Sequence, residues 1–170
     1  MRFSIRSFKE GTPPAEFEET LVLPDFAREN VNVESISSVE VSLIASAESQ
    51  VIFVSGTAKA EVEYECCRCL KTYRDNLVGE IREGFTERPD KENVEEDIHL
   101  LTSEWVDMDE YVAESLQLAL VYKPLCRPDC KGLCEQCGHD LNVSDCGCEV
   151  KHEDPRLEAL RDLLSAGDSE

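Results

Sequence analysis

Nine cysteines constrain this chain more than any other feature of its sequence. Six of them lie between residues 126 and 148, and the other three are Cys66, Cys67 and Cys69. Pairs spaced C-x-x-C or C-x-C present two sulfur atoms from one turn. Two such pairs supply the four soft ligands that a tetrahedral zinc ion requires. The cysteine pattern therefore predicts a protein organised in part by one or two Zn²⁺ ions.

The choice between metal ligands and disulfides depends on the compartment in which the protein works. The first ten residues contain no continuous apolar segment of the kind found in secretion signals. No apolar run approaches the ~20 residues of a membrane span. We therefore expect a cytoplasmic protein without membrane contact. In a reducing compartment, clustered cysteines are more often metal ligands or redox groups than disulfides.

Spacing divides eight of the cysteines into two sets of four. One set can form a local site because only eight residues separate its two pairs; it contains Cys134, Cys137, Cys146 and Cys148. The other set would join two distant pairs; it contains Cys66, Cys69, Cys126 and Cys130. In the alternative scheme, a single zinc takes its ligands from the C-terminal six cysteines, and the first pair consists of ordinary thiols. Cys67 has no place in either scheme and is interpreted as a free or buried thiol.

The cysteines also allow chemistries other than structural zinc. Four thiolates can hold an iron–sulfur cluster, and a C-x-x-C pair can act as a redox couple. The sequence offers few other catalytic motifs, since no Ser/His/Asp arrangement, phosphate-binding loop or H-E-x-x-H pattern is present. An all-cysteine zinc site is usually closed to substrate water. We therefore expect no enzymatic activity and no small-molecule substrate.

The rest of the sequence predicts an α+β fold. Apolar residues alternate with polar ones around residues 39–43 and 62–66, and a further strand is expected from residue 73 to about 85. These patterns indicate a mainly antiparallel β-sheet or partial barrel in the N-terminal half. Asp107 and Glu110 form a capping-box pattern for a central helix that ends before Pro124. Asp154-Pro155 opens a C-terminal helix.

This pattern suggests two domains. Residues 1–122 would form a β-rich domain that includes an exposed acidic loop over residues 86–97 and the central helix. Residues 123–170 would form a cysteine-rich zinc-knuckle module with the C-terminal helix.

Charge restricts how such a protein can bind nucleic acid. The chain carries 17 basic and 37 acidic residues, a net charge of −20, and half of the excess lies between residues 80 and 114. Binding through bulk electrostatics requires lysine and arginine to replace phosphate counterions. Any RNA contact must therefore come from a local basic patch, whereas an acidic face could bind a basic partner.

Several motifs together resemble a known family. They are Cys66-x-Arg68-Cys69-Leu70, Pro124-Leu125-Cys126, Cys130-Lys131-Gly132-Leu133-Cys134, Cys137-Gly138-His139-Asp140-Leu141-Asn142 and Asp154-Pro155-Arg156-Leu157. In this order they resemble the bacterial YceD family, the large ribosomal RNA subunit accumulation proteins, over residues 35 to 164. The resemblance implies a role in accumulation of 23S ribosomal RNA and in assembly of the large ribosomal subunit. Cys67 departs from the family's pattern.

Local charges permit RNA contact near the predicted bridging zinc. Six basic residues flank the two distant cysteine pairs, and Tyr73 and Tyr122 lie nearby for stacking on bases. The RNA-binding candidates are Arg68, Lys71, Arg74, Lys123, Arg127 and Lys131. Alternatively, these residues pair with the neighbouring carboxylates Glu63, Glu65, Asp75 and Asp129.

Three hypotheses follow from these observations. The leading one is a zinc-stabilised ribosome-assembly factor that binds ribosomal RNA or a precursor of the large subunit. The second is an acidic adaptor that holds a basic ribosomal protein. The third is a zinc–thiol redox sensor that releases its metal when it is oxidised.

Overall fold

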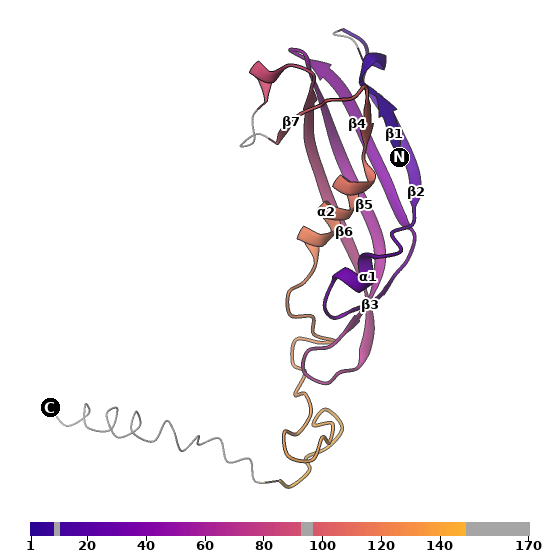
Figure 1. The fold of residues 1–170 in the computed structure, drawn as a ribbon. Coiled ribbons are helices and arrows are strands. Elements are labelled where there is room, and N and C mark those ends of the chain that lie inside the picture. Colours follow the sequence, from indigo (N-terminus) through magenta and orange to yellow (C-terminus); the bar gives the residue numbers. More distant parts are fainter. Residues whose placement is uncertain (9–10, 93–96, 149–170) are drawn as a thin grey trace, which may run out of the picture.

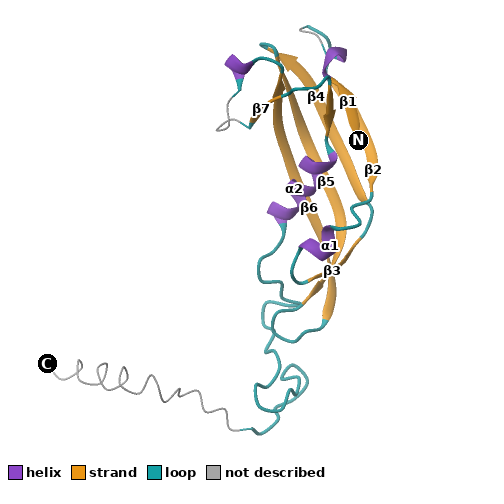
Figure 2. Cartoon of the chain, in the orientation of Figure 1, coloured by secondary structure: helices purple, strands orange, loops and turns teal. Residues whose placement is uncertain are grey.

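A curved β-sheet runs along most of the molecule, and cysteine-rich loops extend from one end of it (Figures 1 and 2). The computed structural model describes residues 1–8, 11–92 and 97–148. The helix predicted to open at Asp154 lies outside the described residues. Among those that are described, no helix has the length and apolar character needed to cross a membrane.

Six strands form the main sheet, in the order β2-β4-β5-β6-β7 with β3 beside one end of β5. Their bounds are β2 Ala15–Leu21, β3 Val33–Ile36, β4 Val39–Glu48, β5 Val51–Glu65, β6 Thr72–Thr86 and β7 Ile98–Leu100. All of the pairings are antiparallel except that of β6 with β7. The α+β class and the antiparallel sheet are confirmed, but the sheet does not close into a barrel.

The β5–β6 hairpin sets the length of the sheet. Its register runs from Ile52 opposite Phe85 to Glu65 opposite Thr72 without a break. The alternation seen in the sequence becomes an alternation of faces, because successive side chains of a strand point to opposite sides. Val41, Leu43 and Ala45 of β4 are buried, whereas the intervening residues face solvent. One face of the sheet is therefore a core surface and the other is polar.

Helix α2 (Asp109–Ala119) covers the core face (Figure 1). Val112 and Leu116 are fully buried beneath it. The helix approaches β6 closely at Gly79, where an added Cβ would lie 2.6 Å from Ser115 Oγ. The central helix is thus confirmed, but its N-cap is Met108, so the predicted capping box is not formed. Asp107 instead accepts the backbone NH of Asp109 at 3.3 Å.

Short elements complete the core. Strand β1 (Arg2–Ser4) pairs with β8 (Trp105–Asp107) in a separate two-stranded sheet. Helix α1 (Phe26–Glu29), which the sequence did not indicate, buries Phe26. Two 3₁₀ turns, η1 (Ile5–Ser7) and η2 (Pro89–Lys91), lie toward the end of the sheet away from the cysteines. The turn η2 lies within the predicted acidic loop, whose described residues 87–92 are exposed.

Candidate metal centres

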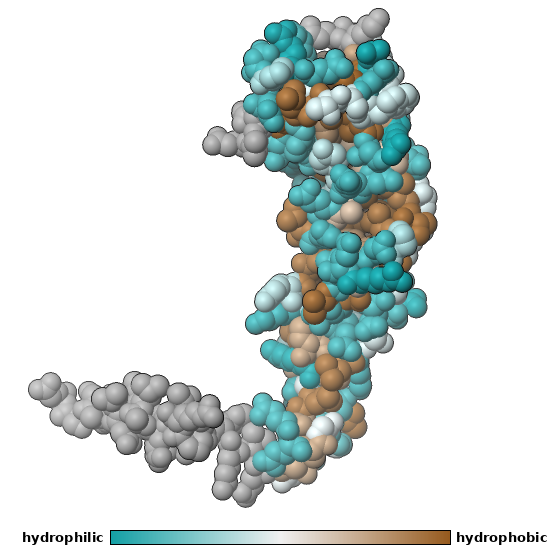
Figure 3. Space-filling model, viewed as in Figure 1, coloured by the Kyte–Doolittle hydropathy of each residue, from teal (hydrophilic) through white to brown (hydrophobic). Residues whose placement is uncertain are grey.

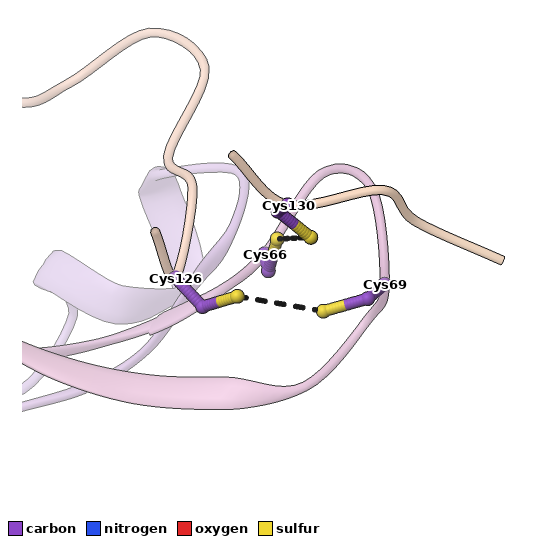
Figure 4. A group of neighbouring side chains, drawn as sticks. All are labelled: Cys66, Cys69, Cys126 and Cys130. Carbon is purple, nitrogen blue, oxygen red and sulfur yellow. Dashed lines mark hydrogen bonds between the residues drawn. The ribbon is translucent and has the colours of Figure 1, made fainter. Parts of the chain in front are cut away.

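The first candidate centre joins two parts of the chain that are far apart in sequence. Cys66 and Cys69 lie in the turn at the tip of the β5–β6 hairpin, and Cys126 and Cys130 lie in the loop that follows α2 (Figure 4). All four sulfur atoms lie within 4.8 Å of one another. We call this group the bridging tetrad. The sequence prediction that these four cysteines converge is met.

The sulfur spacing tests whether a zinc ion fits. Zn–S bonds of about 2.3 Å in a tetrahedron place the sulfur atoms about 3.8 Å apart. The Cys66 and Cys130 sulfurs are 3.8 Å apart, and those of Cys69 and Cys126 are 3.6 Å apart. These separations are far longer than a disulfide bond of about 2 Å. The bridging tetrad thus has the donor type and the spacing of a zinc site.

Backbone hydrogen bonds shape the first turn of this centre. The NH of Leu70 donates to the carbonyl of Cys66 at 2.9 Å, and the NH of Cys66 donates to the carbonyl of Lys71 at 3.0 Å. Leu70 has a φ of +57°, a left-handed conformation that is unfavourable for a residue with a side chain. The turn is therefore a tight knuckle that aims both thiols to one side.

The second candidate centre repeats this knuckle. The sulfur atoms of Cys134, Cys137, Cys146 and Cys148, the C-terminal tetrad, also lie within 4.8 Å of one another. The NH of Gly138 donates to the carbonyl of Cys134, and the NH of Cys134 donates to the carbonyl of His139, both at 2.8 Å. The sequence offsets equal those of the first knuckle. Gly138 takes the left-handed position at φ +71°, as its place after the C-x-x-C pair predicts.

Within each tetrad, one thiol has a lowered pKa and another has a raised pKa. Burial opposes ionisation of Cys66, but backbone NH groups, led by that of Cys126, lower its pKa to about 6. Backbone NH groups of Cys137 and Gln136 likewise lower the pKa of Cys134 to about 6. The pKa of Cys126 rises to about 12 through burial and its thiol neighbours. A bound divalent cation would stabilise the thiolates and so offset the burial and the thiol contacts that raise the pKa of Cys126.

A chain of polar contacts connects the two centres. Lys71 Nζ lies 2.5 Å from Asp140 Oδ2, and Asp140 Oδ1 accepts the side-chain amide of Asn142 at 2.8 Å. The same amide lies 3.5 Å from Cys130 Sγ of the bridging tetrad. Asn142 Oδ1 also accepts the backbone NH of Lys131 at 2.8 Å.

The loop between Cys137 and Cys146 therefore supports a cysteine that belongs to the other centre. Sequence reasoning did not assign this role to Asp140 and Asn142. The available sign was that these two polar residues lie two positions apart, just after the C-x-x-C-G motif of residues 134–138.

Cys67 belongs to neither tetrad. Its side chain is exposed, which corrects the interpretation as a buried thiol, and it lies outside both groups of four sulfur atoms. Its NH and its Sγ both contact the carbonyl oxygen of Pro124, at 3.0 and 3.2 Å. Cys67 thereby ties the first knuckle to the segment that leaves α2.

The six predicted RNA-binding residues have different surroundings. Four are engaged within the protein: Arg68 with the Cys130 carbonyl, Lys71 with Asp140, Arg74 with Glu61 and Glu63, and Arg127 with Asp129 and Asn142. The alternative of pairing with neighbouring carboxylates thus holds for Arg74 with Glu63 and for Arg127 with Asp129.

The remaining two basic residues, Lys123 and Lys131, are exposed. Lys123 Nζ lies 6.0 Å from the centre of the Tyr122 ring. Of the two candidate stacking residues, Tyr73 is stacked on Tyr64 with ring centres 5.7 Å apart, whereas Tyr122 is 88% exposed.

An open, mainly antiparallel sheet that ends in two groups of four cysteines, each of which could hold a metal ion, defines a small α+β class of protein. The sequence profile of the family described as "Large ribosomal RNA subunit accumulation protein YceD" matches residues 54–164. The chain therefore belongs to the YceD family.

Two bacterial relatives are each named as an uncharacterised protein. An uncharacterised protein of Mycobacterium tuberculosis is 30% identical over 139 residues, which cover 80% of this chain and 67% of that protein. The uncharacterised protein YlbN of Bacillus subtilis is 27% identical over 90% of both chains.

A protein of Zea mays named "Large ribosomal RNA subunit accumulation protein YCED homolog 1, chloroplastic" is 33% identical over 48 residues. These residues cover 28% of this chain and 16% of the maize protein. No solved structure matches the chain.

Proposed function

We propose that this protein is a non-catalytic, zinc-binding cytoplasmic factor that supports accumulation of 23S ribosomal RNA and assembly of the large ribosomal subunit. It does so by binding ribosomal RNA, alone or in a precursor particle, at the cysteine-loop end of the molecule. The observation that carries the proposal is the bridging tetrad, which brings together two loops that are each flanked by basic residues. The cellular process in this proposal, accumulation of large-subunit ribosomal RNA, is suggested by the description of the YceD family.

Zinc is the metal that suits both centres best. Each offers four thiol sulfurs within 4.8 Å of one another, and all-cysteine tetrahedral sites in proteins are typical of structural zinc. Such a site has no position left for a substrate or an activated water. The metal would therefore fix the loops, and the working surface would lie on the side chains beside them.

Charge at this end differs from charge over the whole molecule. Residues 66–74 and 122–148 carry six basic and four acidic side chains, whereas the whole chain carries 17 and 37. Each filled tetrad adds about two negative charges, since four thiolates surround one divalent ion. The positive charge that could attract RNA phosphates is therefore local, and it is carried by a few exposed side chains. Of these, Lys123 and Lys131 are the least committed to contacts within the protein.

Charge reversal tests the proposal. The double variant Lys123→Glu/Lys131→Glu should lose crosslinking to ribosomal RNA in cells, because the two exposed ammonium groups can no longer replace phosphate counterions. Lys59→Glu/Arg82→Glu, on the polar face of the sheet, makes the same change in net charge and should keep the crosslinks. Zinc content must stay equal in both variants. Unchanged crosslinking in the Lys123→Glu/Lys131→Glu variant would exclude the proposal that RNA binds at the cysteine-loop end of the molecule.

The acidic adaptor remains a second candidate because of the polar face of the sheet. Glu18 of β2 and Glu80 of β6 lie in one cross-strand row, and Glu40 of β4 lies in the next row, opposite Lys59. Under this candidate, changing Glu18, Glu40 and Glu80 to Gln should weaken salt-sensitive binding to a basic ribosomal protein. Binding that is indifferent to these changes would exclude the polar face as the contact.

A further inference from the structure

A pocket lies where the sheet meets the cysteine loops. Three segments that are distant in sequence line it: the α1–β3 connection at residues 30–32, Cys67 of the first knuckle, and the end of α2 with the residues that follow, up to Lys123. Its volume is about 630 Å³, within the range of roughly 300–1,000 Å³ that is usual for sites that hold small ligands. We call it the neck pocket.

Hydrogen bonds hold its walls in place. The NH of Glu65 donates to the carbonyl of Asn32 at 2.9 Å, which fixes the α1–β3 connection to the end of β5. The NH of Cys67 donates to the carbonyl of Pro124, and the side chain of Asn30 donates to the carbonyl of Phe26 at 2.7 Å. The pocket is therefore largely formed before any ligand arrives.

The lining combines a flat aromatic group, apolar side chains, amides and a cation. Tyr122 and Val31 are each 88% exposed, and Val121 is 54% exposed. Figure 3 shows hydrophobic residues among hydrophilic ones at the surface of the narrow part of the molecule, between the sheet and the cysteine loops. Exposed apolar side chains that gather in one patch often mark a site where a partner or ligand binds. Asn32 and Gln117 also line the pocket, and their side-chain amides can each donate and accept a hydrogen bond.

We infer that the neck pocket binds one unpaired nucleobase of RNA. The ring of Tyr122 provides a stacking face, the amides of Asn32 and Gln117 can pair with base edges, and Lys123 can meet the adjoining phosphate. This inference rests on the proposed RNA-binding function and specifies its ligand. A base stacked in a duplex cannot enter, so the site selects single-stranded segments. Basic groups at the cysteine loops would hold the phosphates that follow.

The bridging tetrad gives this site a dependence on metal. Cys67, which lines the pocket, lies between the ligands Cys66 and Cys69 and contacts Pro124, two residues before the ligand Cys126. Metal at the bridging tetrad would therefore fix one wall of the neck pocket directly. Loss of that metal should weaken base binding even if the sheet stays folded.

The test uses the zinc-loaded full chain and a fluorescent single-stranded oligouridine of about 12 nucleotides, with the same strand in a duplex as comparison. Tyr122→Ala should weaken binding of the single strand by roughly 5- to 150-fold, the range for loss of one stacked base. Tyr122→Phe keeps the ring and should bind within about twofold of the wild type. Trp105→Ala removes another exposed aromatic residue, on β8, and should change nothing.

The outcomes separate the pocket from the proposed function. If Tyr122→Ala binds as the wild type does while Lys123→Glu/Lys131→Glu does not bind, RNA binding stands and the neck pocket is not its base site. Equal affinity for single strand and duplex also overturns the inference, as does crosslinking of Tyr122 to a protein rather than to RNA. If the wild type binds no RNA, both proposals fail. Equal zinc content in every variant shows that the loops are intact.

Discussion

The sheet and the cysteine loops are stabilised in different ways. Large side chains such as Phe85, Leu43 and Ile81 are fully buried in the sheet domain, and long antiparallel ladders satisfy its backbone. In residues 122–148, by contrast, the buried residues are Pro124, Cys130, Gly132 and Cys134. Apolar burial is the main favourable contribution to folding. Because residues 122–148 bury few apolar side chains, they lack the apolar core that stabilises the sheet. One chain thus contains a region with its own apolar core and a region whose few buried residues include cysteines that could hold metal.

Metal removal should produce the largest difference between the two regions. Structural zinc contributes on the order of 10 kcal/mol per site to the folding of small modules. After chelation, the amides of Leu70, Cys134 and Gly138 should lose protection from hydrogen exchange, because the knuckle turns open. Amides in the β5–β6 ladder should stay protected. Hydrogen-exchange mass spectrometry measures both in one sample.

Metal content should also fall in steps. The wild type should bind two zinc ions per chain, and Cys66→Ser/Cys69→Ser should bind one. The matched variant Cys146→Ser/Cys148→Ser should also lose one ion, from the other centre. A single ion in the wild type, unaffected by the first double variant, would contradict the bridging site.

Truncation of the core should affect the sheet and spare the metal. Phe85 is fully buried and packs edge-on against Tyr111, with ring centres 5.1 Å apart. Phe85→Ala should lower the free energy of unfolding by about 3–5 kcal/mol, because it leaves a cavity. Phe53→Ala, on the exposed face of the neighbouring strand, is the control and should cost much less. Denaturant unfolding measures the loss of stability, and zinc analysis measures the metal content. Release of metal from the folded Phe85→Ala protein would contradict the idea that the sheet and the metal centres are stabilised separately.

Asn142 should couple the two centres more weakly. Its amide contacts Cys130 Sγ, and its carbonyl oxygen accepts the backbone NH of Lys131. Asn142→Ala should lower zinc affinity at the bridging tetrad by about 10- to 100-fold, the usual effect of losing a group that supports a ligand. Competition with a chromophoric chelator measures this, and Val143→Ala provides an exposed neighbour as control. Equal affinities in the two variants would show that Asn142 does not support the site.

The smallest effect should distinguish the two knuckles themselves. Leu70 and Gly138 occupy equivalent left-handed positions, but only Leu70 bears a side chain there. Gly138→Ala should weaken its site by about 1 kcal/mol, and this cost comes from the backbone because a Cβ at Gly138 would meet nothing within 4 Å. Leu70→Gly should strengthen the bridging site by up to a similar amount. The measurement is the chelator concentration that removes half of the zinc from each site. If the two variants shift this concentration in opposite directions, the positions of Leu70 and Gly138 are equivalent; shifts in the same direction contradict the equivalence.

Much of this arrangement could be predicted from the sequence, and the rest depends on tertiary contacts. Spacing predicted the two groups of four cysteines, beside the alternative of one zinc held by the C-terminal six, since a short turn limits where its sulfurs can lie. Strand alternation likewise predicted β4, β5 and β6. The partner of Asn142, by contrast, is a cysteine from the other group, and no local pattern encodes such a contact. Tyr73 looked as available for stacking as Tyr122 until the fold placed it against Tyr64.

The bridging tetrad also closes the chain on itself. Cys69 and Cys126 are 57 residues apart in sequence, and β6, β7, β8 and α2 all lie between them. A link of this span limits the freedom of the unfolded chain, and by the entropy of loop closure a comparable covalent crosslink stabilises by about 4 kcal/mol. A metal ion at the tip of the hairpin would thus tether the far end of α2, and its departure would return that freedom to the chain. With metal bound, the bridging tetrad would therefore be a reversible crosslink whose closure depends on the supply of metal.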